Sequence, residues 1–349
     1  MGVRLVSNPP NPYETAYREW LGEPPPARLE VYEEQARSIV TKNESPDIPF
    51  DYSINPYRGC QHACAYCYAR TTHEYLGYGA GTDFDSKIFV KVNAADLLEG
   101  TISRPRWRGD AITFSGVTDC YQPLEAVYKV TRACLDVCVR YRNPVGIITK
   151  SFLITRDIDL LAELARVASV HVCTSIAFIE DTVARRIEPG APPPSRRFEA
   201  VRLLSQAGIP VSVMVAPLIP GLNDREVPAL LERAAECGAT SASFGMLRLA
   251  GNVAPVFLAR LREQLPRRAA RVEQLIRDAR CGALNNSQFF ERFKGHGAYW
   301  QSVTTLFNQT AARLGLDRSP RETRNGPAVA NTPGRRPLPI AGQLRLFES

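Results

Sequence analysis

Short apolar segments alternate with longer amphipathic segments through the middle of the chain. The apolar segments are rich in β-branched residues and end at polar or turn-forming positions, which predicts strands. These predicted strands cover residues 50–54, 111–117, 145–149, 170–176, 211–216 and 241–247. The segments between them place apolar residues on one helical face, which predicts helices. The helices are expected at residues 124–142, 157–167, 196–206 and 227–236.

The alternation of strand and helix indicates an α/β protein. Successive strands joined through helices form a parallel sheet with right-handed crossovers. Six such units predict a partial (β/α)6 barrel of the TIM type, which places the site at the carboxyl ends of the strands.

The ends of the chain have a different composition. Residues 1–45 contain two proline-rich runs, at 8–12 and 24–26, and predict an extended N-terminal arm. We expect the barrel itself in residues 46–250 and a helical extension in residues 251–317. Residues 318–349 are rich in Pro, Arg and Gly, which predicts a disordered tail.

Composition excludes several classes of protein. A chain of 349 residues with 44% hydrophobic content can build one large core. The longest apolar runs are interrupted by Lys150, Pro217 and Pro220, so no membrane span is expected. Nine cysteines without paired spacings, and no apolar leader at the N-terminus, predict a reducing cytoplasmic location.

The formal charge of +7 is concentrated in the last part of the chain. Residues 256–349 carry 16 Lys and Arg against 7 Asp and Glu, whereas the preceding residues carry 27 against 29. A basic segment of this kind suggests a polyanionic partner such as nucleic acid. An arginine-rich surface that serves only solubility is the alternative.

Three cysteines stand within eight residues of the chain, at Cys60, Cys64 and Cys67. Thiolates at this spacing can each bind a different iron of a [4Fe–4S] cluster and leave the fourth iron without a protein ligand. An iron with an open position can bind a small molecule and pass it an electron. A zinc site is the first alternative, but it usually needs a second pair of ligands, which the sequence lacks. Three inert buried thiols are the second alternative.

The spacing CxxxCxxC, with the aromatic Tyr66 before the last cysteine, resembles the radical S-adenosylmethionine (SAM) superfamily. The resemblance implies that the open iron binds the amino and carboxylate groups of SAM. It also implies reductive cleavage of SAM to methionine and a 5′-deoxyadenosyl radical, with an electron from a reductant such as flavodoxin or ferredoxin.

Several polar residues follow predicted strands and therefore lie at the expected edge of the barrel. Lys150 ends the third strand, where a cation is costly unless an anion meets it. The carboxylate of SAM is one such anion, and a salt bridge to Asp119 or Glu188 is the alternative. Thr118 and Ser175 could bind the ribose and the amino group, although such residues also cap helices.

Two further residues beside the predicted site have open roles. Tyr66 could lie near the adenine of SAM. Cys120 follows the second strand and could give a hydrogen atom to a substrate radical, or it could be an ordinary buried cysteine.

A longer set of matches is similar to one subgroup of this superfamily, the uncharacterised proteins related to spore photoproduct lyase. The matching stretches are residues 45–50, 53–60, 118–119, 121–123, 142–145, 147–151, 216–224 and 247–249. By this resemblance Cys60, Cys64 and Cys67 ligate the cluster, and the residues that contact SAM are Tyr66, Tyr68, Thr118, Lys150 and Ser175. The catalytic residues that act on the substrate stay unassigned.

The sequence also departs from this subgroup. Val117 stands where the lyase has its hydrogen-donating cysteine, and Cys120 stands where relatives usually have proline. The resemblance therefore implies the cofactor chemistry and a lyase-like, DNA-repair type of role on nucleic acid, without naming the substrate. The rival hypothesis is a non-catalytic DNA-associated protein with a structural iron–sulfur or zinc site.

The segment Gln343-Leu344-Arg345-Leu346-Phe347 resembles the peptide by which bacterial repair proteins dock on the DNA sliding clamp. Apolar residues that follow a Pro/Arg-rich linker can fill a groove on a partner. The alternative is that they fold back onto the barrel.

Overall fold

The structure is a computed structural model that describes residues 12–13 and 28–317. The predicted tail, with the clamp-like segment at residues 343–347, lies outside the described residues.

A seven-stranded sheet forms the centre of the molecule, in the order β10-β9-β8-β7-β6-β3-β2. Its strands are β2 (Val40–Lys42), β3 (Tyr52–Ile54), β6 (Ile112–Phe114), β7 (Val145–Thr149), β8 (Val170–Ser175), β9 (Val211–Leu218) and β10 (Ser241–Met246). All neighbours from β3 to β10 are parallel, and β2 pairs antiparallel with β3 at the edge. The six parallel strands confirm the predicted α/β partial barrel.

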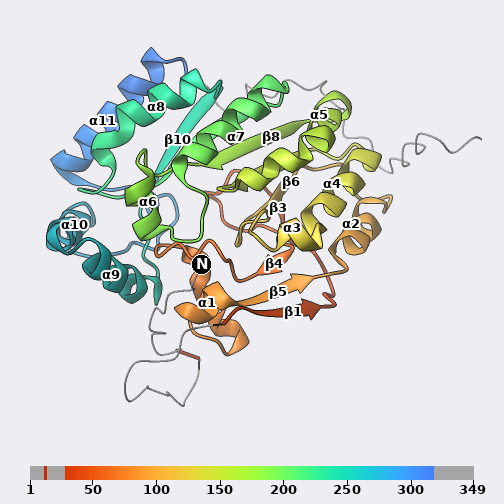
Figure 1. Cartoon of the computed structure of the whole chain (residues 1–349), viewed down its shortest axis with the longest axis horizontal. Coiled ribbons are helices and arrows are strands. Elements are labelled where there is room, and N and C mark those ends of the chain that lie inside the picture. The colour runs from red at the N-terminus through yellow and green to blue at the C-terminus, as the bar shows by residue number, and fades with distance from the viewer. Residues whose placement is uncertain (1–11, 14–27, 318–349) are drawn as a thin grey trace, which may run out of the picture.

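The crossover helices lie along the outer face of this sheet (Figure 1). They are α2 (Ala94–Ile102), α3 (Glu125–Tyr128), α4 (Val130–Tyr141), α5 (Ile158–Val167), α7 (Pro194–Gln206) and α8 (Val227–Glu236). Their apolar faces and the strands share one continuous core of buried residues such as Phe114, Leu135, Val172 and Leu230. Burial of these faces holds the helices on the sheet.

The segment predicted as one helix over residues 124–142 is two helices. Lys129 adopts a left-handed conformation, with φ of 54°, and separates α3 from α4. The buried Glu125 carboxylate accepts hydrogen bonds from the backbone N–H groups of Thr131, at 2.9 Å, and Arg132, at 3.2 Å. The Glu125 carboxylate thereby caps the start of α4. The chain must turn at Lys129 to bring this carboxylate to the end of the helix.

A second, three-stranded sheet has the order β1-β5-β4 and was not predicted. It consists of β1 (Glu30–Glu34), β4 (Tyr57–Arg58) and β5 (Lys87–Lys91), and it lies beside α1 (Thr82–Ser86) in Figure 1. Residues 28–45, which the sequence places in an extended arm, thus supply β1 to this sheet and β2 to the larger one. Because β4 leads directly into the cysteine segment, the small sheet positions that segment at the barrel's edge.

Residues 251–317 contain α9 (Val253–Gln264), α10 (Pro266–Asp278) and α11 (Gly297–Arg313). Helices α9 and α10 pack together near α6 (Asp181–Ile187), and α11 packs on α8. The short 3-10 helices are η1 (Tyr68–Thr72), η2 (Glu74–Leu76), η3 (Phe152–Asp157) and η4 (Asp224–Glu226). Among the described residues no helix is both long and apolar enough to cross a membrane.

Candidate cluster and cofactor site

The cysteine loop, residues 59–67, connects β4 to η1. Gly59 has φ of +75°, and a Cβ at this position would come 2.8 Å from the carbonyl oxygen of Lys87. Only glycine fits such a conformation at such close approach. The N–H of Cys60 donates to the carbonyl of Phe84 at 2.9 Å. The start of the loop is therefore fixed against the small sheet and α1.

The other side of the cysteine loop is fixed by residues 187–190, after α6. The N–H of Ala65 donates to the carbonyl of Ile187 at 2.9 Å, and the N–H of Gly190 donates to the carbonyl of His62 at 3.0 Å. A Cβ on Gly190 would lie 2.0 Å from the carbonyl oxygen of Gln61, so the two segments touch backbone to backbone. This contact leaves the loop little freedom.

The three thiols of the loop are all free of disulfides. Cys60 and Cys64 are buried, and Cys67 is half-buried. Burial raises the pKa of each thiol, and Asp119 together with the neighbouring sulfurs raises that of Cys60 further. Thiolates in this position therefore need positive charge, which bound iron supplies.

The donor set fits an iron–sulfur cluster. Three free thiols from one rigid loop can each bind a separate iron. Within the described residues, no three His, Cys, Asp or Glu side chains are arranged around a single metal ion. A cubane cluster does not require such an arrangement, because its thiolates bind different irons.

Next to the thiols lies a buried group of charged and polar side chains. Glu188 accepts hydrogen bonds from the Tyr66 hydroxyl and from the Arg197 guanidinium, and all three side chains are buried. The Lys150 ammonium lies 5.8 Å from the centre of the Tyr66 ring. Burial opposes the charge on Lys150, but the Cys64 sulfur and the Glu188 carboxylate raise its pKa overall.

Lys150 forms no ion pair with a carboxylate among the residues that the structure describes. Glu188 is already bound to Arg197, and the Asp119 carboxylate accepts from the backbone N–H of Lys150, at 2.8 Å, rather than from its ammonium. The salt bridges that were the alternative roles for Lys150 are thus absent within residues 12–13 and 28–317.

Asp119 links the ends of two strands to the cysteine loop. Its carboxylate accepts from the Thr149 hydroxyl at 2.7 Å and lies 3.3 Å from Nδ1 of His62. Burial alone would favour the protonated acid, but His62 and these hydrogen bonds lower the pKa of Asp119. An ionised Asp119 therefore holds the loop against β7.

The other predicted cofactor residues lie at the same edge of the barrel. Thr118 is buried, and its hydroxyl donates to the carbonyl of Tyr57 at 3.0 Å. Ser175 is buried at the end of β8. Tyr68 is 48% exposed, and its hydroxyl donates to the carbonyl of Gly116. Tyr66 thus belongs to the cysteine loop and Tyr68 follows it, whereas Thr118, Lys150 and Ser175 lie at or after the ends of β6, β7 and β8.

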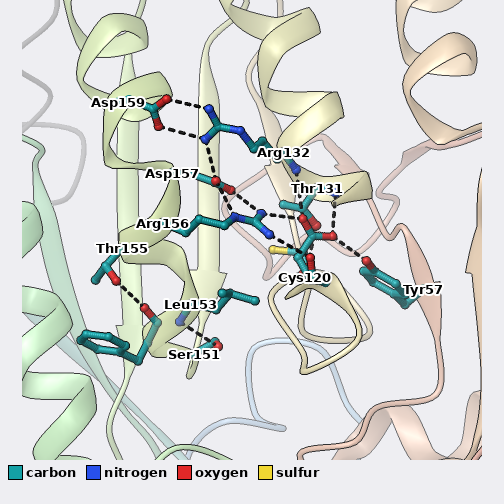
Figure 2. Close-up of polar contacts among 12 residues, drawn as sticks. Tyr57, Cys120, Thr131, Arg132, Ser151, Leu153, Thr155, Arg156, Asp157 and Asp159 are labelled. Carbon is teal, nitrogen blue, oxygen red and sulfur yellow. Dashed lines mark hydrogen bonds and ion pairs between the residues drawn. The ribbon is translucent and has the colours of Figure 1, made fainter. Parts of the chain in front are cut away.

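Cys120 is fully buried in the barrel core, and its N–H donates to the Ser115 hydroxyl at 2.9 Å. Its carbonyl accepts from Thr131, so it is bound to the start of α4 (Figure 2). A chain of ion pairs extends from there through Arg156, Asp157 and Arg132. Cys120 is therefore fully buried, and its backbone is bound to Ser115 and to Thr131 at the start of α4.

Sequence reasoning missed two features of the site. Arg197 was not singled out, because an arginine on an amphipathic helix is usually on the surface, and here it is fully buried. The anchoring of the loop by Glu188 and Gly190 was also missed. The run Glu188-Pro189-Gly190, in which a charge follows the apolar Ile187, was the signal that could have drawn attention to this turn.

The family model of the radical SAM superfamily matches residues 54–234, which is more than half of the chain. The chain belongs to the radical SAM superfamily. Members of this superfamily use a [4Fe–4S] cluster and SAM, and these are the cofactors of this protein.

Several curated proteins are similar in sequence to this chain. An uncharacterized protein of Mycobacterium tuberculosis is 37% identical over 232 residues, which is 66% of this chain and 68% of the relative. An uncharacterized protein of Methanocaldococcus jannaschii is 32% identical over 200 residues, or 57% and 72% of the two chains. A radical SAM Nalpha-GlyT isomerase of Pseudomonas phage M6 is 26% identical over 72% of this chain and 51% of its own.

Among solved structures, spore photoproduct lyase in complex with the dinucleoside spore photoproduct has a similar fold. The TM-score is 0.57 at 18% sequence identity, over 81% of this chain and 78% of the lyase. The comparison confirms the relation to the spore photoproduct lyase fold that the sequence suggested.

Proposed function

We propose that Cys60, Cys64 and Cys67 ligate the [4Fe–4S] cluster and that the enzyme acts on nucleic acid. One observation carries the proposal: three free thiols lie on a rigid loop at the carboxyl edge of the barrel, beside a lysine without a carboxylate partner in the described residues. A purely structural metal site has no need for such a lysine.

Lys150 binds the carboxylate of SAM in this proposal. Its charge is supported by Cys64 and Glu188, and its own strand end is held by Asp119. A charge-assisted hydrogen bond to a carboxylate is stronger than a neutral one and is directional. Tyr66 stays fixed by Glu188 and forms an aromatic surface between the cysteine loop and Lys150.

Three further residues complete the contacts to SAM. Thr118, which follows β6, and Ser175, at the end of β8, supply hydroxyl groups, and Tyr68 supplies an exposed ring beside Cys67. The Thr118 hydroxyl already donates to Tyr57, so it acts as an acceptor.

When bound, the cluster would supply the electron that cleaves SAM reductively. An external reductant of the flavodoxin or ferredoxin type would return an electron to the cluster. The chain holds the cofactor on the loop and excludes water from two of the three thiols. These are the tasks that its own residues perform.

The proposal of a nucleic-acid substrate is supported by the activities of similar proteins and by charge. Spore photoproduct lyase is seen with a dinucleoside, and the phage relative is named for an action on Nalpha-GlyT. Residues 256–349 are strongly basic, as a polyanionic substrate would require. The reaction differs from that of the lyase in this proposal, because Val117 stands in place of the hydrogen-donating cysteine and Cys120 is buried in the core.

The test uses anaerobically reconstituted protein with SAM and a strong reductant. We expect formation of 5′-deoxyadenosine, detected by liquid chromatography. The rate of SAM cleavage should rise when DNA containing the substrate is added. Comparison of nucleosides from wild-type and deletion cells identifies that substrate. Slow cleavage of SAM that no nucleic acid accelerates, together with identical nucleosides, would contradict the nucleic-acid role and leave the cofactor chemistry standing.

A further inference from the structure

The loop between α10 and α11, residues 284–296, lies at the carboxyl end of the last parallel strand. The N–H of Met246, which ends β10, donates to the carbonyl of Phe293 at 3.0 Å. The Leu249 N–H donates to the side-chain oxygen of Asn285 at 3.2 Å. Parallel strands end at one edge, so this loop lies at the edge that also holds the cysteine loop.

Two adjacent aromatic residues of the loop point into solvent. Phe289 is 51% exposed and Phe290 is 56% exposed. Phe290 also has φ of +66°, in the left-handed region that bulky residues rarely adopt. Such a conformation persists only where surrounding contacts enforce it, and it is concentrated at functional sites.

The contacts that enforce it come from Asp47. This carboxylate accepts from the N–H of Phe290 at 3.0 Å and from Nε of Arg292 at 2.8 Å. The Arg292 guanidinium lies 5.0 Å from the centre of the Phe289 ring and 5.1 Å from that of Phe293. The side chains of Asp47 and Arg292 are nearly buried, so the exposed Phe289 and Phe290 are supported by a rigid ion pair.

Arg248, which follows β10 by two residues, lies in the electrostatic field of Arg292, Asp47 and Tyr68. Burial and the nearby Arg292 lower the pKa of Arg248, whereas Tyr68 and Asp47 favour its charge. The side chain is half-buried, and its buried Nε atom has no hydrogen-bond partner among the described residues. Tyr68, which is near this guanidinium, follows Cys67 directly, so a cation lies close to both Arg292 and the residue after a predicted cluster ligand.

We infer that Phe289 and Phe290 form a stacking platform for an unpaired base of a DNA strand, and that Arg248 binds a phosphate of the same strand. The inference rests on the proposed nucleic-acid function and specifies how the strand is held. Exposed aromatic rings beside a cation suit single strands, because every base has a face that stacks and every linkage carries a negative charge. A preformed platform also binds without the entropic cost of ordering its side chains and loop.

The platform would favour a base that is already out of the helix. A base must leave the duplex before a buried reaction site can reach it. When the reacting base leaves the duplex, the base next to it in the strand stacks on Phe289 and Phe290, which compensates for part of the lost stacking energy. The phosphate bound at Arg248 fixes the direction of the strand toward Cys67.

The experiment titrates the full-length, cluster-loaded protein into a fluorescein-labelled single strand and into its duplex, followed by anisotropy. A second single strand carries 2-aminopurine, whose fluorescence falls when it stacks on an aromatic ring. We expect the single strand to bind more tightly than the duplex, and the double variant Phe289→Ala/Phe290→Ala to weaken single-strand binding by about tenfold and abolish the quenching. The control Tyr75→Ala removes an aromatic side chain that is 71% exposed elsewhere and should leave both signals unchanged.

The variant Phe290→Gly separates binding from folding. Glycine accepts φ of +66° without strain, so its melting temperature should equal or exceed that of the wild type while single-strand binding still falls. If the wild type binds DNA and the Phe variants bind it equally well, the platform is overturned and the nucleic-acid function stands. If the wild type binds neither strand nor duplex, both proposals fail, and the exposed pair serves a different partner such as a protein.

Discussion

Glu188 shows how individual residues set the chemistry beside the cluster loop. Burial alone would favour the neutral acid, but Arg197 and Lys150 lower the pKa of Glu188 and keep it ionised. Its two oxygens are occupied by Arg197 and by the Tyr66 hydroxyl. One carboxylate thus faces two cations and forms its ion pair with Arg197.

The substitution Glu188→Gln should destabilise the protein by about 3–5 kcal/mol, the usual cost of breaking a buried pair and leaving one charge alone. Urea unfolding of the apoprotein measures this. The matched control is Glu232→Gln, which removes a surface partner of Arg313 and should change the free energy of unfolding by less than about 1 kcal/mol. Equal effects of the two substitutions would show that the Glu188–Arg197 pair does not support the site.

The substitution Lys150→Ala should weaken SAM binding by about 2 kcal/mol, or roughly 30-fold, because a charge-assisted hydrogen bond is lost. Calorimetric titration of the reconstituted protein with SAM measures it, and iron content serves as the control for an intact cluster. An affinity that stays at the wild-type value would remove Lys150 from the site.

At the scale of elements, the cysteine loop is clamped between the small sheet and the turn after α6. Gly190 is the point of closest contact, because its backbone lies against Gln61 where no Cβ can fit. The shape of the loop therefore depends on a residue far from it in sequence.

The substitution Gly190→Ala should displace the loop and reduce iron incorporation sharply. The control Gly100→Ala lies in α2, where a Cβ meets nothing within 4 Å, and should raise stability by about 0.5–1 kcal/mol. Iron per chain after anaerobic reconstitution distinguishes the two. Normal iron in Gly190→Ala would mean that the turn after α6 does not shape the site.

Much of the barrel was predictable from the sequence because most of its strands are short, largely apolar runs. Residues 145–149, for example, form a continuous apolar run whose bounds match β7, and Gly208 ends α7 as a glycine should. The break at Lys129 was not predictable, because it depends on Glu125 folding back to cap α4. Strands β1, β4 and β5 were missed because short strands with charged residues carry little periodic signal.

For the site, the sequence predicted the groups that carry chemistry better than the groups that position them. Cysteine spacing is a local signal, so Cys60, Cys64 and Cys67 stood out at once. Arg197 pairs with Glu188 across the turn between α6 and α7, and Asp47 pairs with Arg292 far along the chain, and no periodic pattern reveals either pair. Their roles depend on the tertiary structure.

At the scale of the whole molecule, the C-terminal helices share a core with the site. Buried Cys64, Ala65 and Tyr66 pack in one cluster with Leu249 and Phe257, the latter from α9. The helices after residue 251 thus form part of the wall behind the cysteine loop.

The clamp-like segment gives a prediction for the tail. A labelled peptide of residues 338–349 should bind the DNA sliding clamp of the source organism with a micromolar dissociation constant. This corresponds to a binding free energy of about −8 kcal/mol. The paired change Leu346→Ala and Phe347→Ala should abolish binding, because it removes the apolar side chains that fill a groove. A wild-type peptide that shows no binding at high micromolar clamp would contradict this role.

The central claim is that Cys60, Cys64 and Cys67 bind a [4Fe–4S] cluster with one open iron. The most direct measurement combines iron content with electron paramagnetic resonance of the reduced protein, with and without SAM. We predict about four irons per chain and a signal that changes on adding SAM, both lost in Cys60→Ala, Cys64→Ala and Cys67→Ala. Cys281→Ala, which removes an exposed thiol, should keep both. Tightly bound zinc without iron under strict anaerobiosis, or a cluster that survives loss of any of the three cysteines, would contradict the account.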